Sequence, residues 1–313
     1  MAANFESGFF VREAAWHGLG TVVSEAPTTA DALRLAGLDW HVALEPMFLD
    51  DGTLVPVRRA VVRDSDRSIL GDVSESYVPA QPQQALDFMD ALLGEGLKLS
   101  TAGSLRGGSR IWLMSEAPAV DILGDPVQPF LGITTSFDGS SSTTIYNTVV
   151  RTVCENTLDM GLAGASRTWK ARHTSTIADR VKEAQRTLKL AGDYVDAIAE
   201  KAGRYAATKI SSEEFKRIVN EIFGDDSETG DMSQKQKSNT MHLTAQLGLA
   251  LRRPDLENFK GTAWHLYNAF GDFASHIDPV RKTAEWRENL WESFIDGNKT
   301  LISVERMLDK IVA

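Results

Sequence analysis

The sequence holds a single cysteine, Cys154, among 313 residues. A lone cysteine excludes an internal disulfide framework and is typical of a protein in a reducing compartment. No apolar run is long enough to cross a bilayer, and the first residues lack the basic start and apolar centre of a secretory signal peptide. We therefore expect a soluble, cytoplasmic protein that makes no contact with a membrane.

Recognisable catalytic and cofactor motifs are also missing. The six histidines include no pair four residues apart, and neither HExxH nor CxxC occurs, so we expect no metal ion. The glycines near residues 103–108 match neither a P-loop nor a dinucleotide fingerprint, so we expect no cofactor. Cys154 lies near Arg151 and could act as a nucleophile, but such a cysteine is more often a small buried residue. An enzyme is therefore the function class that the sequence supports least.

Basic charge is scarce in total but unevenly spread. The formal net charge is −10 at pH 7, which argues weakly against a nucleic-acid partner. Residues 166–189 nevertheless hold seven basic and two acidic side chains, whereas residues 191–232 hold five basic and ten acidic ones. A polyanion responds to the local distribution of charge rather than to the net charge. A solvated charged helix followed by a charged loop would explain the same pattern without any ligand.

The pattern of apolar residues divides the chain into two parts. Strand-like segments dominate the first part, whereas almost everything beyond residue 174 has helical periodicity. We expect an α+β protein: a mixed or antiparallel sheet built from hairpins and packed on helices, then a mostly helical part with one long helix. We place a β-rich domain at residues 1–165 and a helical region at residues 166–313, with a loop or boundary near residues 224–232.

Two consecutive hairpins are the clearest part of the expected sheet. Gly107-Gly108 and Asp138-Gly139 are dipeptides typical of tight turns. They separate four strand-like segments, which are residues 97–105, 109–115, 130–137 and 142–150. We predict that both hairpins are antiparallel and lie in one sheet.

One apolar stripe predicts the long helix. Apolar residues recur in alternating steps of four and three from Ile177 to Ala202. We expect this stripe to be buried, either on the sheet or against a neighbouring subunit, because exposing so many aligned apolar side chains would lower solubility. Stripes of this kind pack inside one chain more often than in a two-stranded coiled coil.

Residues able to bind an anion surround the two expected turns. Small side chains at residues 101–104 would leave the backbone open, and hydroxyl residues surround the second turn. Arginine forks, hydroxyls and backbone amides hold phosphates, and an aromatic ring among cations can stack on a base. Ordinary solvated turns would contain the same residue types. The predicted nucleic-acid contacts are Arg106, Arg110, Arg151, Arg167, Trp169, Lys170 and Arg172.

Several unusual motifs occur in one order along the chain. They are WHGLG (16–20), TAGSLRGGSRIW (101–112), SFDGSSSTT (136–144), VVRTVCENTL (149–158), RHT (172–174) and GTAWHLYNAFGDFASH (261–276). With them the chain strongly resembles the phage/plasmid-like proteins grouped as domain of unknown function 932. The resemblance implies a bacteriophage or other mobile element in a bacterial host, and it transfers no catalytic residue. A weaker architectural similarity is to phage single-strand annealing recombinases, which place a hairpin-built sheet against a long helix and assemble around one strand.

These observations lead to three function hypotheses. The first is a single-stranded DNA-binding protein, serving annealing or recombination, that acts as a homo-oligomer. The second is a non-enzymatic phage assembly or host-interaction protein whose helical part makes the contact. The third is an enzyme with a site assembled from remote residues. We expect the first of these.

Overall fold

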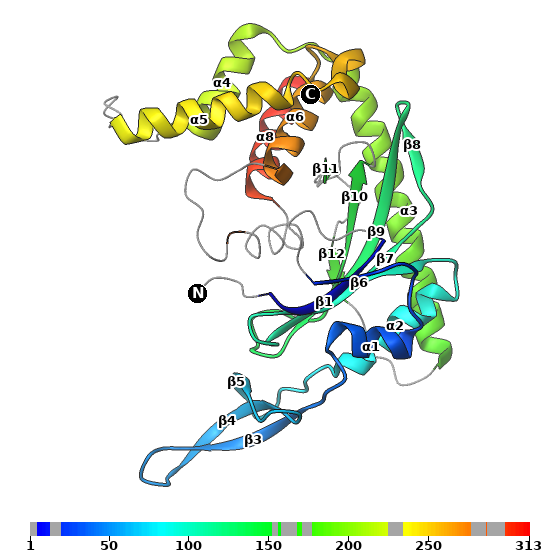
Figure 1. Ribbon diagram of the computed structural model, residues 1–313, viewed down its shortest axis with the longest axis vertical. Coiled ribbons are helices and arrows are strands. Elements are labelled where there is room, and N and C mark those ends of the chain that lie inside the picture. The colour runs from blue at the N-terminus through cyan, green and yellow to red at the C-terminus, as the bar shows by residue number, and fades with distance from the viewer. Residues whose placement is uncertain are drawn as a thin grey trace.

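The computed structural model describes residues 5–12, 20–151, 156–157, 168–170, 177–224, 234–276, 286 and 298–313. Within these residues the chain is α+β, as expected, with its sheets first and most of its helices later (Figure 1). The main sheet has nine strands in the order β11-β10-β9-β7-β6-β1-β2, with β12 beside β10 and β8 beside β9. These strands are β1 (Phe5–Val11), β2 (Thr21–Val23), β6 (Lys98–Leu105), β7 (Arg110–Glu116), β8 (Val120–Ile122), β9 (Asp125–Ser136), β10 (Thr144–Arg151), β11 (Asn156–Thr157) and β12 (Thr168–Lys170).

Both predicted hairpins are confirmed. β6 pairs with β7 and β9 pairs with β10, each in antiparallel register, and β7 pairs with β9, so that the two hairpins lie in one sheet. Gly107, Gly108 and Gly139 have φ angles of 63°, 87° and 74°. Residues with a Cβ rarely adopt such angles, so the glycines set both turns. The parallel pairing of β1 with β2 makes the sheet mixed.

A second, three-stranded antiparallel sheet, which we call the arm, extends away from the rest of the molecule (Figure 1). Its strands are β3 (Val42–Phe48), β4 (Leu54–Arg63) and β5 (Ile69–Ser74). Val61 and Val73 at the base of the arm are buried against the main sheet and its helices. The far end, residues 46–57, which we call the arm tip, has no fully buried residue.

Helices cover one face of the main sheet. They are α1 (Thr29–Ala36), α2 (Pro82–Leu93) and the first half of α3 (Ile177–Ala207). The Thr28 hydroxyl accepts a hydrogen bond from the backbone N–H of Asp31, and Gly37 ends α1 with φ +66°, which satisfies both ends of this short helix. Apolar residues of these helices pack with those of β1, β7, β9 and β10, and we call this cluster the sheet–helix core.

The predicted stripe on α3 is buried or partly buried within the chain at the positions whose side chains the structure describes. Ala184, Ile198 and Ala202 are fully buried, and Leu188, Ala191 and Val195 are partly buried. Ala184, Leu188 and Ala191 pack into the sheet–helix core, whereas the last three positions pack into a second cluster. The side chains of Ile177 and Val181 lie outside the described residues.

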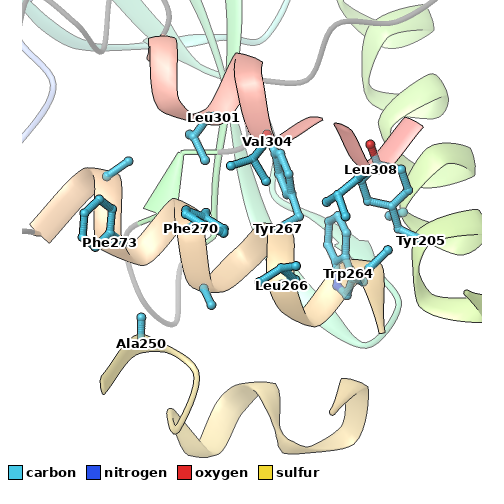
Figure 2. Close-up of a cluster of buried hydrophobic side chains, with 14 of the residues drawn as sticks. Tyr205, Ala250, Trp264, Leu266, Tyr267, Phe270, Phe273, Leu301, Val304 and Leu308 are labelled. Carbon is cyan, nitrogen blue, oxygen red and sulfur yellow. The ribbon is translucent and has the colours of Figure 1, made fainter. Parts of the chain in front are cut away.

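The second cluster, which we call the helical core, joins the later helices to the end of α3. These are α4 (Ser212–Phe223), α5 (Gln234–Ala250), the 3-10 helix η1 (Pro254–Phe259), α6 (Ala263–His276) and α8 (Lys299–Val312). Figure 2 shows Tyr267 and Phe270 of α6 facing Val304 of α8. Ile122 and Val149 of the main sheet belong to the same cluster. The proposed division at residue 165 remains a prediction, and this core receives residues from both sides of it.

His265 links α6 to the end of α5 through both ring nitrogens. Its Nδ1 accepts a hydrogen bond from the backbone N–H of Gly261 at 3.3 Å, and its Nε2 lies 3.1 Å from the carbonyl oxygen of Leu251. The neutral ring with its proton on Nε2 satisfies both contacts. Burial lowers the pKa of His265 below its ordinary value.

We expect His265 to make the protein less stable in mild acid. The unfolded chain takes up the proton at a higher pH than the folded chain. The contribution of neutral His265 to the free energy of unfolding is therefore fully present above about pH 6.5. It declines as the pH falls through the lowered pKa of the folded state. Urea unfolding across a pH series should show a weaker pH dependence for His265→Gln than for the unmodified protein. An identical pH dependence would contradict this role.

Candidate nucleic-acid interface

Three of the predicted contacts lie at one end of the main sheet, which we call the turn end. The β6–β7 turn contains Arg106, and Arg110 begins β7 opposite Ser136. Lys170 of β12 pairs with Thr144, the first residue of β10. The antiparallel register therefore brings together residues that are more than sixty positions apart in the sequence.

The other basic residues of the predicted set do not all join them. Arg151 ends β10 and pairs with Asn156, seven residues along the strand from Thr144. At the rise of a β-strand this separation is about 23 Å, so Arg151 lies at the opposite end of the sheet. The side chain of Arg151 and the whole of Arg167 and Arg172 lie outside the described residues.

Arg110 is not a surface cation. Its exposed fraction is 8%, and its Nε donates a hydrogen bond to the Thr134 hydroxyl at 3.1 Å. The Thr134 hydroxyl donates in turn to the carbonyl oxygen of Ile111. This corrects the expectation that Arg106 and Arg110 act as an exposed pair. The sequence places an arginine on each side of the turn, and this pattern does not indicate that only Arg106 is exposed to solvent.

Trp169 faces a different side of the sheet from Lys170. It pairs with Ile145 of β10 and packs, partly buried, against the sheet–helix core. Its indole nitrogen is buried and has no hydrogen-bond partner. Successive residues of a strand point to opposite faces, so Lys170 points away from that core. The expectation that the Trp169 ring stacks on a base among cations is therefore corrected. The ring packs into the core instead.

The small residues before the first turn make room for aromatic rings rather than for a ligand. A Cβ on Gly103 would lie 2.4 Å from the ring of Trp112, and one on Gly132 would lie 2.2 Å from the ring of Tyr146. Both rings belong to a buried cluster on the face of the main sheet opposite the sheet–helix core, which we call the aromatic face. The backbone at residues 101–104 is buried, which corrects the expectation that it is open.

The hydroxyl residues around the second turn bind mainly to one another. The hydroxyl of Thr143 donates to that of Thr135, and the hydroxyl of Ser136 donates to the carbonyl oxygen of Ser141 and accepts from its N–H. Thr135, Ser136 and Thr143 are buried. Ser140 and Ser142 are exposed, and they are the serines of this turn that a ligand can reach.

Acidic residues at the turn end are the component that sequence reasoning missed. Arg63, from the base of the arm, lies against Gly108 and donates hydrogen bonds to Glu6 at 2.8 Å and to Asp66 at 2.6 Å. Glu6 and Asp66 are sixty residues apart in the sequence. No local pattern indicates that they share one arginine beside the predicted turn.

Asp138 adds a further negative charge to the turn end. Burial acts to raise its pKa, but hydrogen bonds from Ser140 and Ser136 outweigh that effect, so the pKa lies below the ordinary value. The carboxylate is therefore ionised at neutral pH. The side chain of Tyr77, in the segment that follows β5, donates a hydrogen bond to the carbonyl oxygen of Ser136 and holds that segment against this turn.

An exposed strip remains at the turn end. It contains Arg106, Gly107, Gly139, Ser140 and Lys170. Arg106 has φ +57°, and nothing lies within 4 Å of the place where a Cβ on Gly107 would be. The backbone here, unlike that of residues 101–104, can be approached by a bulky anion. The strip is small and has acidic neighbours, so it suits a few phosphates rather than a long track.

The described residues show neither a metal-binding group nor a membrane-spanning helix. Within the described ranges, no group of three or more His, Cys, Asp and Glu side chains is placed to hold a metal ion. In the same ranges, none of the helices combines the length and the apolar composition that spanning a membrane requires. Cys154, the nucleophile considered from the sequence, lies outside the described residues.

Comparison with known proteins identifies a family and nothing closer. No curated protein and no solved structure matches the chain. Residues 69–293 match the model of a protein family described as a domain of unknown function, DUF932. That range runs from the arm through both hairpins and α3 to beyond α6. The chain therefore belongs to the DUF932 family.

Proposed function

We propose that this protein binds single-stranded DNA at the turn end of the main sheet and acts without catalysis. It would do so as a phage or mobile-element protein in the cytoplasm of a bacterial host, in annealing or recombination. The observation that carries the proposal is the antiparallel register that places Arg106 and Lys170, both exposed, beside two glycine turns. Cations beside open backbone amides are the usual contacts of a phosphate backbone.

The described strip predicts weak binding by a single molecule. Two cations neutralise about two phosphates, and each phosphate contact on a single strand contributes about 0.7 to the slope of log affinity against log salt. Glu6, Asp66 and Asp138 oppose the strand at the same end. Useful affinity would therefore require several copies on one strand, because linked contacts multiply. Arg151, Arg167 and Arg172 remain predicted contacts.

We expect Arg106→Ala/Lys170→Ala to reduce the salt slope by about 1.4 units and to weaken binding at low salt. Fluorescence anisotropy with a labelled thymidine oligonucleotide over a salt series measures both effects. A matched control is Lys216→Ala/Lys310→Ala, which removes the same charge from exposed positions on α4 and α8. Equal losses in the two variants would mean that binding follows net charge alone. Absence of binding by the unmodified protein at low salt would reject the proposal.

A second candidate function is protein assembly or host interaction, and the arm favours it. The sequence placed that contact in the helical part. The arm, in contrast, projects apolar side chains into solvent from the β-rich part, including Phe48 and Leu54. Exposed apolar clusters of this kind commonly mark protein interaction sites. DNA binding and arm-mediated contact use different surfaces and are compatible.

A further inference from the structure

The arm tip carries a concentrated set of exposed apolar side chains. Phe48, Leu49, Leu54 and Val57 are each about half exposed or more, and Phe48 pairs directly with Leu54 across the ribbon. A two-stranded ribbon has no core of its own, so these side chains lack the burial that apolar residues usually find in a sheet. They form an apolar end on a projecting element.

The backbone of the arm tip is strained at one of these residues. Val57 has φ +56°, in the left-handed region, although it is β-branched. The pairing of β3 with β4 is irregular here, and the backbone N–H of Glu75 donates to the carbonyl oxygen of Val57. Strain of this kind persists where the surrounding structure enforces it, and it often accompanies a binding function. Here the strained residue is Val57 itself, whose side chain is 61% exposed.

The charge of the arm tip is negative. Residues 46–57 include Asp50 and Asp51 and no basic residue. The arginines nearer the base already have acidic partners: Arg58 pairs with Asp72, Arg59 with Glu75, Arg67 with Glu45, and Arg63 with Glu6 and Asp66. A partner for the tip should therefore be apolar and basic.

The outer face of α5 has both properties. Met241, Ala245 and Leu249 follow one another at helical spacing on its exposed side, and Met241 and Leu249 are 72% and 60% exposed. α5 contains two basic residues, Lys235 and Lys237, and no acidic one, whereas Arg253 just beyond its end is paired with Asp255 and Asp272. α5 is therefore apolar on both sides, with Leu247 and Ala250 buried in the helical core and this second row facing solvent.

The two surfaces belong to opposite ends of one molecule. The arm and α5 lie at the two ends of the longest axis (Figure 1), so an arm cannot reach the α5 of its own chain. We propose that the arm tip of one copy docks on the outer face of α5 of a second copy. Apolar side chains match apolar side chains, and Asp50 and Asp51 meet a helix that bears only positive charge.

Such a contact is heterologous, because it joins two different surfaces. A pair joined in this way still has one unused arm, on one copy, and one unused α5, on the other, so the contact repeats and produces a ring or an open filament. The inference does not depend on DNA binding. The proposed contact is the interface of the expected homo-oligomer. The oligomer would present the turn ends of successive copies to one DNA strand, each of which binds it weakly.

Mixing two variants tests the contact with the full-length protein. Phe48→Ser/Leu54→Ser disables the arm tip, and Met241→Gln/Leu249→Gln disables α5; all four residues are exposed, so both variants should fold. Sedimentation velocity over a range of protein concentrations measures association without DNA. We expect concentration-dependent oligomers of the unmodified protein, monomers of each variant alone, and a complex of only two chains when the variants are mixed.

Each alternative has its own outcome in this experiment. Self-association of the α5 variant alone would mean that arms pair with arms or with another surface, and it would overturn the proposal. A monomeric unmodified protein would also overturn it and leave the arm to a different protein. The matched control Val78→Ser/Ile302→Gln removes two exposed apolar residues outside both surfaces and should associate normally. Charge reversal, Asp50→Lys/Asp51→Lys, should weaken association.

Discussion

Lys201→Met is expected to lower the free energy of unfolding by about 3–5 kcal/mol, because it leaves a buried carboxylate without its cation. Lys201 of α3 and Glu305 of α8 form an ion pair whose members are 3% and 5% exposed. The ammonium also lies 2.9 Å from Asp309, and the Tyr205 hydroxyl donates to that carboxylate at 2.8 Å. Burial and the neighbouring Asp309 raise the pKa of Tyr205, so this hydroxyl keeps its proton.

Two further variants distinguish an unpaired buried charge from lost packing as the cause of the lower stability. Lys201→Met/Glu305→Leu removes both charges and should recover most of the stability, since an apolar pair can replace a buried ion pair. Arg204→Met breaks the exposed Arg204–Glu200 pair one turn away and should cost less than about 1 kcal/mol. Urea unfolding followed by circular dichroism measures all three. If the double variant were as unstable as the single one, the loss would come from packing rather than from an unpaired charge.

Gly132→Ala is expected to destabilise the protein by about 3 kcal/mol, at the upper end of the usual cost of overpacking. Three atoms of the Tyr146 ring lie within 2.6 Å of the added Cβ position, and Tyr146 is 1% exposed and cannot swing into solvent. Gly132 and Tyr146 are direct cross-strand partners on β9 and β10. The ring and the glycine thus form one packing unit of the aromatic face.

A double-mutant cycle isolates that unit. In a Tyr146→Ala background the ring is gone, and Gly132→Ala should cost less than about 1 kcal/mol, a propensity effect in a strand. Thermal unfolding of the four proteins gives the coupling energy. Equal costs of Gly132→Ala in the two backgrounds would show that the backbone, and not the ring, requires glycine there. Gly107→Ala is a poor control, because its φ of 63° adds strain of its own.

The parts of the fold that the sequence predicted depend on short-range chemistry. Dipeptides that contain glycine place both hairpin turns, and helical spacing marks α3. β1 was missed, although it lies within the main sheet between β6 and β2. Its sequence includes Gly8, which weakens a strand pattern. A Cβ on Gly8 would lie 2.9 Å from the backbone carbonyl oxygen of Ala102 on β6 and 3.2 Å from the ring of Trp112, so the reason for the glycine lies in residues far away in the sequence.

The candidate site was less predictable than the fold, because exposure decides which cations can bind a ligand. Arg106 and Arg110 both flank the turn, but only the register with β9 buries Arg110 beside Thr134. Trp169 shows the same limit, since its pairing with Ile145 turns its ring toward the core. The projection of the arm into solvent was not expected either, because a local sequence pattern does not show what packs on either side of a strand pair.

The passage of α3 through both cores bears on how this gene can change. Its first half completes the sheet–helix core at Ala184 and its second half completes the helical core at Ile198. A recombination event that joined the sheet of one relative to the helices of another would place an α3 from one relative against a core from the other, and the packing of its side chains in that core would be lost. The arm tip, inserted between α1 and α2, lies outside both cores, so its packing constrains neither of them. Inheritance should therefore keep the sheet and the helices together, while the arm tip varies only in step with the outer face of α5 that it contacts.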